Sequence, residues 1–148
     1  MALAQATCLE RLGRKEEALQ QKRAIFAESS ALLGRTHPDV LLNGNNLSQS
    51  LVSNGHFAEA RRHAREHLAV TRLAVGKNHR LAIDATSRLG EALCKDPERT
   101  YADAIELEAL SVDTAEASRL TYGPRHPDTL KAYANVESSR ALLARLSP

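Results

Sequence analysis

The sequence predicts an all-α protein built from repeated antiparallel helix pairs, and three observations support this. Hydrophobic residues make up 43% of the chain, alanine and leucine dominate them, and tryptophan is absent, which suits helices that pack closely through small side chains. The Asn-Gly pair in LLNGNNLSQSL at 41–51 is not flanked by alternating apolar and polar residues, so it does not indicate a hairpin. The third observation is an internal repeat with a step of 42 residues, which determines how every element is interpreted.

Length and charge limit the classes of protein and partner. The 148 residues correspond to one domain with enough chain to bury a core. A net charge of +2 and a pI near 8.7 are too mild to indicate a nucleic-acid partner. Cys8 and Cys94 lack metal-type spacing and are expected to be free thiols. No signal-like or membrane-spanning apolar run is present, so we expect a cytoplasmic protein with no membrane partner.

The repeat is carried by two markers. LGRTHPDVL at 33–41 returns as YGPRHPDTL at 122–130 and, in weaker form, as VGKNHRLAI at 75–83. His37, His79 and His126 are separated by 42 and then 47 residues, so the third unit contains five extra residues. GRKEEA at 13–18 returns as GHFAEA at 55–60, again 42 residues on. Each unit therefore consists of a helix, a short glycine turn, a second helix and a loop.

The markers also predict where the helices begin and end. Pro38 and Pro127 fit a first helical turn, with Thr36 or Asn78 placed to cap. Gly13 is placed to end a first helix. KDPERTYAD at 95–103 replaces the equivalent turn in the third unit, and we expect this loop to absorb most of the extra residues. The predicted helices are 2–12, 15–33, 38–53, 57–75, 80–94, 100–121 and 127–146.

Apolar stripes along these helices predict how they pack. The second helices show Ala18, Ile25 and Leu32 in one unit, and Ala60, Ala64, Leu68, Thr71 and Val75 in the next. In the helix at 38–53 the packed stripe is Val40, Gly44, Leu47, Ser48 and Leu51. Gly44 is small where two helices must approach closely. One pair cannot bury such stripes, so stacking of neighbouring pairs supplies the core.

The motifs LGxxHPDxL, NNL, and Gly followed five positions later by Ala, at a 42-residue step, resemble the tetratricopeptide repeat in its longer kinesin-light-chain form. The resemblance covers nearly the whole chain, in units of about 1–35, 36–77, 78–124 and a partial 125–148. It implies a right-handed superhelix, a TPR-type α-solenoid, whose first helices line a concave groove. It also implies a scaffold that binds a protein or peptide, with no catalytic residues, no cofactor and no metal.

Polar residues beside the packed stripes are the candidate ligand contacts. Carboxamides can bond a peptide backbone through both donors and acceptors. Register positions in the three first helices give the predicted binding set: Asn45, Asn46, Gln49, Asp84, Arg88, Glu91, Lys131 and Asn135. The carboxylate clamp of some tetratricopeptide proteins would place Leu3, Thr7 and Asp84 at clamp positions, so an internal extended or helical segment is the expected ligand. The alternatives are that these residues are merely solvated, or that the chain is a spacer or dimerisation segment of a larger protein.

The ends of the chain have two interpretations. Either they are degenerate capping elements, or the chain is a segment of a longer array. The second interpretation is favoured because Leu142, Leu143 and Leu146 are expected to be exposed. End-to-end self-association follows from that interpretation.

Three other patterns in the sequence offer rival interpretations. HAREH at 63–67 matches the inverted zinc-protease motif, but no third ligand is identifiable and His67 falls at a packing position. HPD also occurs in J-domain cochaperones, although here it starts helices. Residues 56–80 hold six cations against two acids, and 96–118 hold seven acids against one arginine. This asymmetry predicts complementary charge between neighbouring units, with a basic RNA-binding patch as the weaker alternative because stacking aromatics are lacking.

Overall fold

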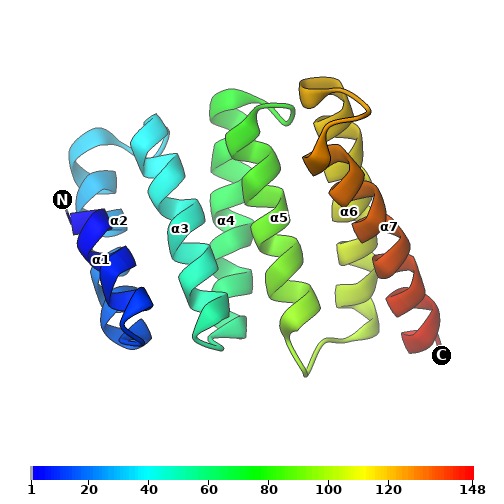
Figure 1. Cartoon of the computed structure of the whole chain (residues 1–148), viewed down its shortest axis with the longest axis horizontal. Helices are drawn as coiled ribbons and strands as arrows, with labels where there is room; N and C mark the ends of the chain where they lie inside the picture. The colour runs from blue at the N-terminus through cyan, green and yellow to red at the C-terminus, as the bar shows by residue number, and fades with distance from the viewer. Residues whose placement is uncertain (1) are drawn as a thin grey trace.

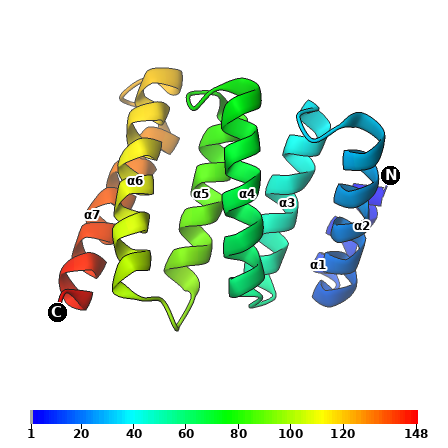
Figure 2. The same cartoon turned by 180° about the vertical axis from the view of Figure 1, so that it is seen from behind.

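A computed structural model describes residues 2–148, and these residues form seven α-helices arranged in sequential antiparallel pairs. The helices are α1 (Ala2–Arg11), α2 (Lys15–Leu33), α3 (Pro38–Ser53), α4 (Phe57–Val75), α5 (Arg80–Lys95), α6 (Tyr101–Tyr122) and α7 (Pro127–Leu146). Every predicted helix is present, and each boundary agrees with the prediction to within one residue. The helices form two layers: α1, α3, α5 and α7 face the viewer in Figure 1, and α2, α4 and α6 face the viewer from behind in Figure 2. None of the described helices is long and apolar enough to span a bilayer.

Helices α3, α5 and α7 start at histidine caps, which differs from the prediction of Thr36 or Asn78. In His37, His79 and His126 the ring Nδ1 accepts a hydrogen bond of 3.2 Å from the backbone N–H two residues later. Proline follows directly in α3 and α7, where its missing N–H leaves no helical hydrogen bond unmade. The repeated HP pair is therefore a helix start in which the histidine supplies the capping acceptor.

The five extra residues of the third unit lie mostly in a helix, which corrects the expectation of a longer loop. The turn between α3 and α4 is residues 54–56, and the corresponding turn between α5 and α6 is residues 96–100. The remaining difference lies in α6, which has 22 residues where α4 has 19. The capping box between Thr100 and Asp103 fixes where this longer helix starts.

The predicted packed stripes are largely confirmed. Val40, Gly44, Leu47, Ser48 and Leu51 are all buried in α3, and Ala60, Ala64, Leu68 and Thr71 are buried in α4. Three leucines were predicted wrongly. Leu32 was expected to pack and is exposed. Leu142 and Leu143 were expected to be exposed, but Leu142 is buried and Leu143 half-buried in the cluster that contains Leu107, because α7 packs along α6.

The close approach predicted at Gly44 has a specific partner. A Cβ placed on Gly44 would lie 2.0 Å from Cε1 of His67 in α4. The buried His67 ring bonds the carbonyl oxygen of Leu41 through Nε2 at 2.9 Å and meets Phe26 edge-on. Gly44 therefore makes room for an imidazole wedged between α3 and α4.

Successive first helices meet at three junctions, and the two that flank α5 differ. Helices α3 and α5 pack directly against each other, whereas α5 and α7 make no backbone contact, and each packs instead against α6. In the α3/α5 junction, Nδ2 of Asn45 donates to the carbonyl oxygen of Leu81 at 3.2 Å. The α5/α7 junction has no such closure and leaves a groove, described below.

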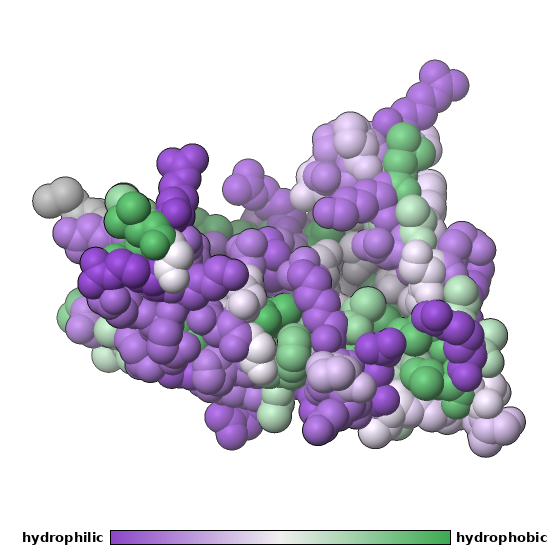
Figure 3. All heavy atoms as spheres, turned by 60° about the horizontal axis from the view of Figure 1, so that its bottom comes forward, coloured by the Kyte–Doolittle hydropathy of each residue, from purple (hydrophilic) through white to green (hydrophobic). Residues whose placement is uncertain are grey.

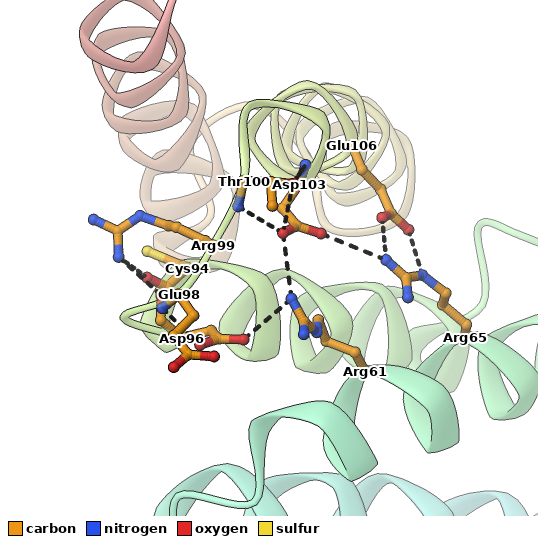
Figure 4. A network of polar contacts seen from close by, with 9 residues as sticks. All are labelled: Arg61, Arg65, Cys94, Asp96, Glu98, Arg99, Thr100, Asp103 and Glu106. Atoms are coloured by element: carbon orange, nitrogen blue, oxygen red, sulfur yellow. Dashed lines mark hydrogen bonds and ion pairs between the residues drawn. The ribbon is translucent and has the colours of Figure 1, made fainter.

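Second helices are linked by ion pairs, as the charge asymmetry predicted. Arg61 in α4 binds Asp96 at 3.1 Å and Asp103 at 3.2 Å, and Arg65 binds Glu106. Figure 4 shows both arginines reaching from α4 toward the turn 96–100 and the start of α6. Burial alone would raise the pKa of Asp103, but hydrogen bonds from Thr100 and the nearby Arg61 and Arg65 hold this pKa below its usual range. The carboxylate therefore stays charged and fixes the turn between α5 and α6.

Candidate functional site

The candidate site is a groove of about 560 Å³ lined by residues of α5, α6, α7 and the turn that follows α5. Figure 3 shows the molecule with the lower ends of the helices brought forward, and the right half of the surface is hollowed there. The groove exists because α5 and α7 diverge across α6 instead of touching. A volume of this size lies within the range typical of ligand pockets.

The floor of the groove consists of apolar side chains and, along α6, of short hydroxyl side chains. Ile83, Leu107 and Leu142 supply its apolar surface. Along α6 the lining residues are Ser111, Thr114 and Ser118. Ser111 and Thr114 donate their hydroxyls to the helix carbonyls of Leu107 and Leu110, each at 2.8 Å. Because these side chains are short and folded back on their own helix, they leave the space open.

The walls of the groove carry more positive than negative charge. The cationic lining residues are Arg80, Arg88, Lys95, Arg99, Lys131 and Arg145, and the acidic ones are Asp84, Glu91 and Asp128. Arg88 is already neutralised by Asp84 at 3.1 Å and Glu91 at 3.2 Å. Lys95, Lys131 and Arg145 form no ion pair with any residue of 2–148. The groove therefore offers uncompensated positive charge around an apolar floor.

Tyr122 lies at the end of α6 in this groove and is held by stacking on His126, with ring centroids 4.9 Å apart. Burial, followed by the charge of Asp128, raises the pKa of the Tyr122 hydroxyl. The hydroxyl therefore stays protonated at neutral pH and is available as a hydrogen-bond donor.

The structure separates the predicted binding set into three groups. Asp84, Arg88, Glu91, Lys131 and Asn135 all line the groove. Asn46 and Gln49 are at least partly accessible on α3, outside the groove. Asn45 is 1% exposed and bonds Leu81 of α5, so it cannot contact a ligand. The prediction for Asn45 is wrong because α3 is covered by α5 as well as by its own partner helix, which buries a wider arc of α3 than the apolar stripe alone indicated.

The sequence interpretation missed the α6 wall and the cations at the lower end of the groove. The missed residues that matter most are Lys95, Leu107, Ser111, Thr114 and Arg145. A signal for the α6 wall was present, because Ser111, Thr114 and Ser118 recur at helical spacing where α4 carries His67, Val70 and Ala74. Arg145 had no comparable signal, since its position depends on how α7 crosses α6.

The HAREH segment packs as an internal element. The His63 and His67 rings stack with centroids 5.6 Å apart, and their Nε2 atoms contact the carbonyl oxygens of Gly44 at 3.1 Å and Leu41 at 2.9 Å. Burial lowers the pKa of His63 and, together with the neighbouring His63 charge, lowers the pKa of His67 to about 4. Both imidazole nitrogens that the zinc-protease motif would use are therefore engaged with backbone oxygens. Among residues 2–148 no group of three potential ligands could hold a metal ion.

Comparison with known proteins identifies the repeat. Residues 45–81 match a family model described as tetratricopeptide repeat, of the kinesin-light-chain type. The matched residues run from the middle of α3 through α4 to the start of α5. No curated protein matches the chain.

Proposed function

We propose that this chain, in which residues 45–81 match a tetratricopeptide repeat of the kinesin-light-chain type, is a non-catalytic interaction module that holds a segment of another protein between α5 and α7. The observation that most supports this function is the groove itself. It combines an apolar floor with unpaired cations and with polar side chains that can hydrogen-bond a peptide backbone. Five residues of the predicted binding set lie along it.

The groove chemistry favours a particular kind of segment. Leu107 and Leu142 provide an apolar surface for one or two ligand side chains, as the buried centre of an interface requires. Asn135 and Ser138 offer donors and acceptors for a peptide backbone. Lys95, Lys131 and Arg145 favour carboxylates on either side of that anchor. We therefore propose an acidic segment with an apolar anchor, bound internally and not through a terminal carboxylate.

Selection from a random peptide library tests this proposal. The enriched peptides are expected to combine acidic residues with an apolar one, and titration should show weaker binding at higher salt because the rim charges are screened. Lys131→Gln with Arg145→Gln should weaken the selected peptides by about tenfold or more, since each charged contact contributes about 1 kcal/mol or more when partly desolvated.

The matched control removes two cations elsewhere. Lys15 and Arg62 are exposed and form no ion pair with any described residue, so Lys15→Gln with Arg62→Gln changes net charge equally without touching the groove. Equal weakening by both double variants would contradict the groove assignment. The pair Asn46→Ala and Gln49→Ala tests whether the ligand extends along α3, because these two residues lie outside the groove.

A structural role is the second candidate, and exposed apolar residues on the last helix pair favour it. Val112 of α6 and Leu130 of α7 are exposed, whereas Leu68 and Leu41, at the matching positions one and two units earlier, are buried. This face is suited to stacking against a further helix or a second copy. Sedimentation across a range of concentrations tests it: self-association that Leu130→Lys abolishes supports the role, and a monomer at all concentrations contradicts it.

A further inference from the structure

One end of the helix array combines exposed leucines with unpaired cations, and neither feature belongs to the groove. The loops α2–α3, α4–α5 and α6–α7 all lie at this end, along the top of both Figure 1 and Figure 2. We define the loop edge as residues 32–37, 73–80 and 119–126, which are these loops and the helix ends that enter them.

Leucines in the last turns of all three second helices are exposed. Leu32 of α2 is 83% exposed, Leu73 of α4 is 89% exposed and Leu120 of α6 is 54% exposed. Each lies two or three residues before the glycine that ends its helix, so the feature recurs once per unit. Leu73 and Leu120 occupy the same repeat position, 47 residues apart, and Leu32 is shifted from it by one residue. A single exposed leucine needs no explanation, but an exposed leucine in the last turn of each second helix is a recurring feature.

Apart from Arg80, which starts α5 and lines the groove, the loop edge carries four cations and no acid. Arg35, Lys77, Arg119 and Arg125 are all exposed. None of them forms an ion pair with any residue between 2 and 148. Several arginines along α2 and α4 differ, because they pair with acids of the next unit. Asp39 and Asp128 lie nearest, each beside its own capping histidine, and they leave the edge positive.

The opposite end of the array differs. Its loops, residues 12–14, 54–56 and 96–100, contain two arginines and two acids. Arg14 binds Glu17, and Arg99 donates to the carbonyl oxygens of Cys94 and Asp96. The loops at this end therefore carry no net charge, and the unpaired cations there are Arg11 and Lys95 in the helix ends that enter the loops.

We infer that the loop edge binds the surface of an anionic lipid bilayer. The leucines would enter the interface between headgroups and acyl chains, and the flanking cations would contact lipid phosphates. An anionic bilayer therefore offers a binding partner to both kinds of residue. A nucleic acid would leave the leucines without a role. A protein partner would favour one contiguous apolar centre, whereas here each leucine stands on a separate helix. A surface contact of this kind needs no spanning helix, and the inference departs from the expectation, drawn from sequence, that no membrane is involved.

A hydrogen bond ties two of the three loops together. The Thr121 hydroxyl at the end of α6 donates to the carbonyl oxygen of Asn78 in the preceding loop at 2.5 Å. The leucines and cations of the second and third units are thereby held together, so little ordering is required when they meet a flat surface.

Vesicle cosedimentation tests the inference with phosphatidylserine–phosphatidylcholine vesicles and with phosphatidylcholine alone. The protein is expected to bind only the vesicles that contain phosphatidylserine. Arg35→Gln, Lys77→Gln and Arg125→Gln together should weaken this binding about 100-fold, because each cation near an anionic leaflet contributes about fivefold. None of these three residues lines the groove, so selected groove peptides should bind this variant unchanged.

The matched control removes three unpaired cations away from the loop edge: Arg11→Gln, Lys15→Gln and Arg62→Gln, with the same change in net charge. This variant should retain vesicle binding. Leu73→Ser with Leu120→Ser should weaken binding, whereas Leu12→Ser, at a leucine 68% exposed at the opposite end, should not. The inference is overturned if wild type does not bind phosphatidylserine vesicles, if both triple variants lose binding equally, or if the leucine variants bind as wild type does. Binding to polyglutamate that the edge variant alone loses, without vesicle binding, would assign the edge to an acidic protein instead.

Discussion

The α3/α5 and α5/α7 junctions are built from the same repeat but have opposite outcomes. In the first, Asn45 bonds Leu81 of α5 and the two helices pack directly, while the His67 ring of α4 fills the space beside Gly44 behind α3. In the second, Ser87 lies one repeat after Asn45 and bonds only its own helix, and Ser111 of α6 stands where α4 has His67. Replacing large bridging side chains by small, self-bonded hydroxyls is what leaves a groove.

The largest expected effect is acid destabilisation of the closed junction. The folded pKa of His67 is about 4, below the ordinary value of about 6.5. As pH falls through 6.5 the unfolded chain binds a proton that the folded chain does not, so stability is complete above that pH and decreases until pH 4. The decrease amounts to about 3 kcal/mol from His67, and burial of His63 adds to it in the same direction.

Chemical denaturation at a series of pH values measures this effect, and His67→Gln is the matched variant because its amide can still donate to Leu41 but does not titrate. The variant should lose most of the pH dependence between 6.5 and 4. Hydrogen exchange should show opening at α3 and α4 first, since no histidine lies within α5 or α6. A wild-type and a variant curve of equal slope would contradict the assignment.

Two helical glycines, Gly44 facing α4 and Gly90 facing α6, should respond with opposite sign. Gly44→Ala places a methyl group in the His67 ring and should lower the free energy of unfolding by about 2 kcal/mol. At Gly90 an added Cβ lies 3.5 Å from Leu107, an ordinary contact, so Gly90→Ala should raise stability by up to about 1 kcal/mol through helix propensity. Thermal or urea unfolding of the two variants decides this, and a loss of equal size at both positions would remove the distinction.

The helices and the close approach at Gly44 were predictable from sequence, whereas the location of the groove was not. Glycine and proline mark helix ends locally, so boundaries follow from a few residues such as Pro38 and Gly55. A small residue on a packed stripe indicates close approach, although its partner His67 lies on another helix. The burial of Asn45 and the opening beside Lys131 depend on the angle between successive pairs. That angle results from all contacts at a junction, so no single motif encodes it.

The Asn45 hydrogen bond should contribute modestly to the closed junction. Asn45→Ala removes the link to Leu81 and should cost about 1 kcal/mol, the usual net contribution of one hydrogen bond. Ser87→Ala at the corresponding position of α5 should change stability little, because its hydroxyl bonds only Ile83 of its own helix. Urea midpoints compared at constant m-value measure both changes. A larger effect at Ser87 than at Asn45 would show that the amide does not close the junction.

The smallest expected effect concerns the second helices. Ion pairs contribute more to the contact between α4 and α6, beside the open α5/α7 junction, than to the contact between α2 and α4. Helices α4 and α6 are joined by pairs of Arg61, Arg65 and Arg72 with acids of the next unit, whereas α2 and α4 are joined by Arg23 and Glu59. Arg65→Gln should cost about 0.5 kcal/mol, since its pair with Glu106 is partly exposed.

Raising salt from about 0.1 M to about 1 M shortens the screening length to about 3 Å, and should therefore loosen α6 and α7 more than α2 and α3. Hydrogen exchange at both salt concentrations measures this, and Arg65→Gln should lose part of the salt response. Equal salt sensitivity in α2 and α6 would show that ion pairs between second helices do not compensate for the missing contact between α5 and α7.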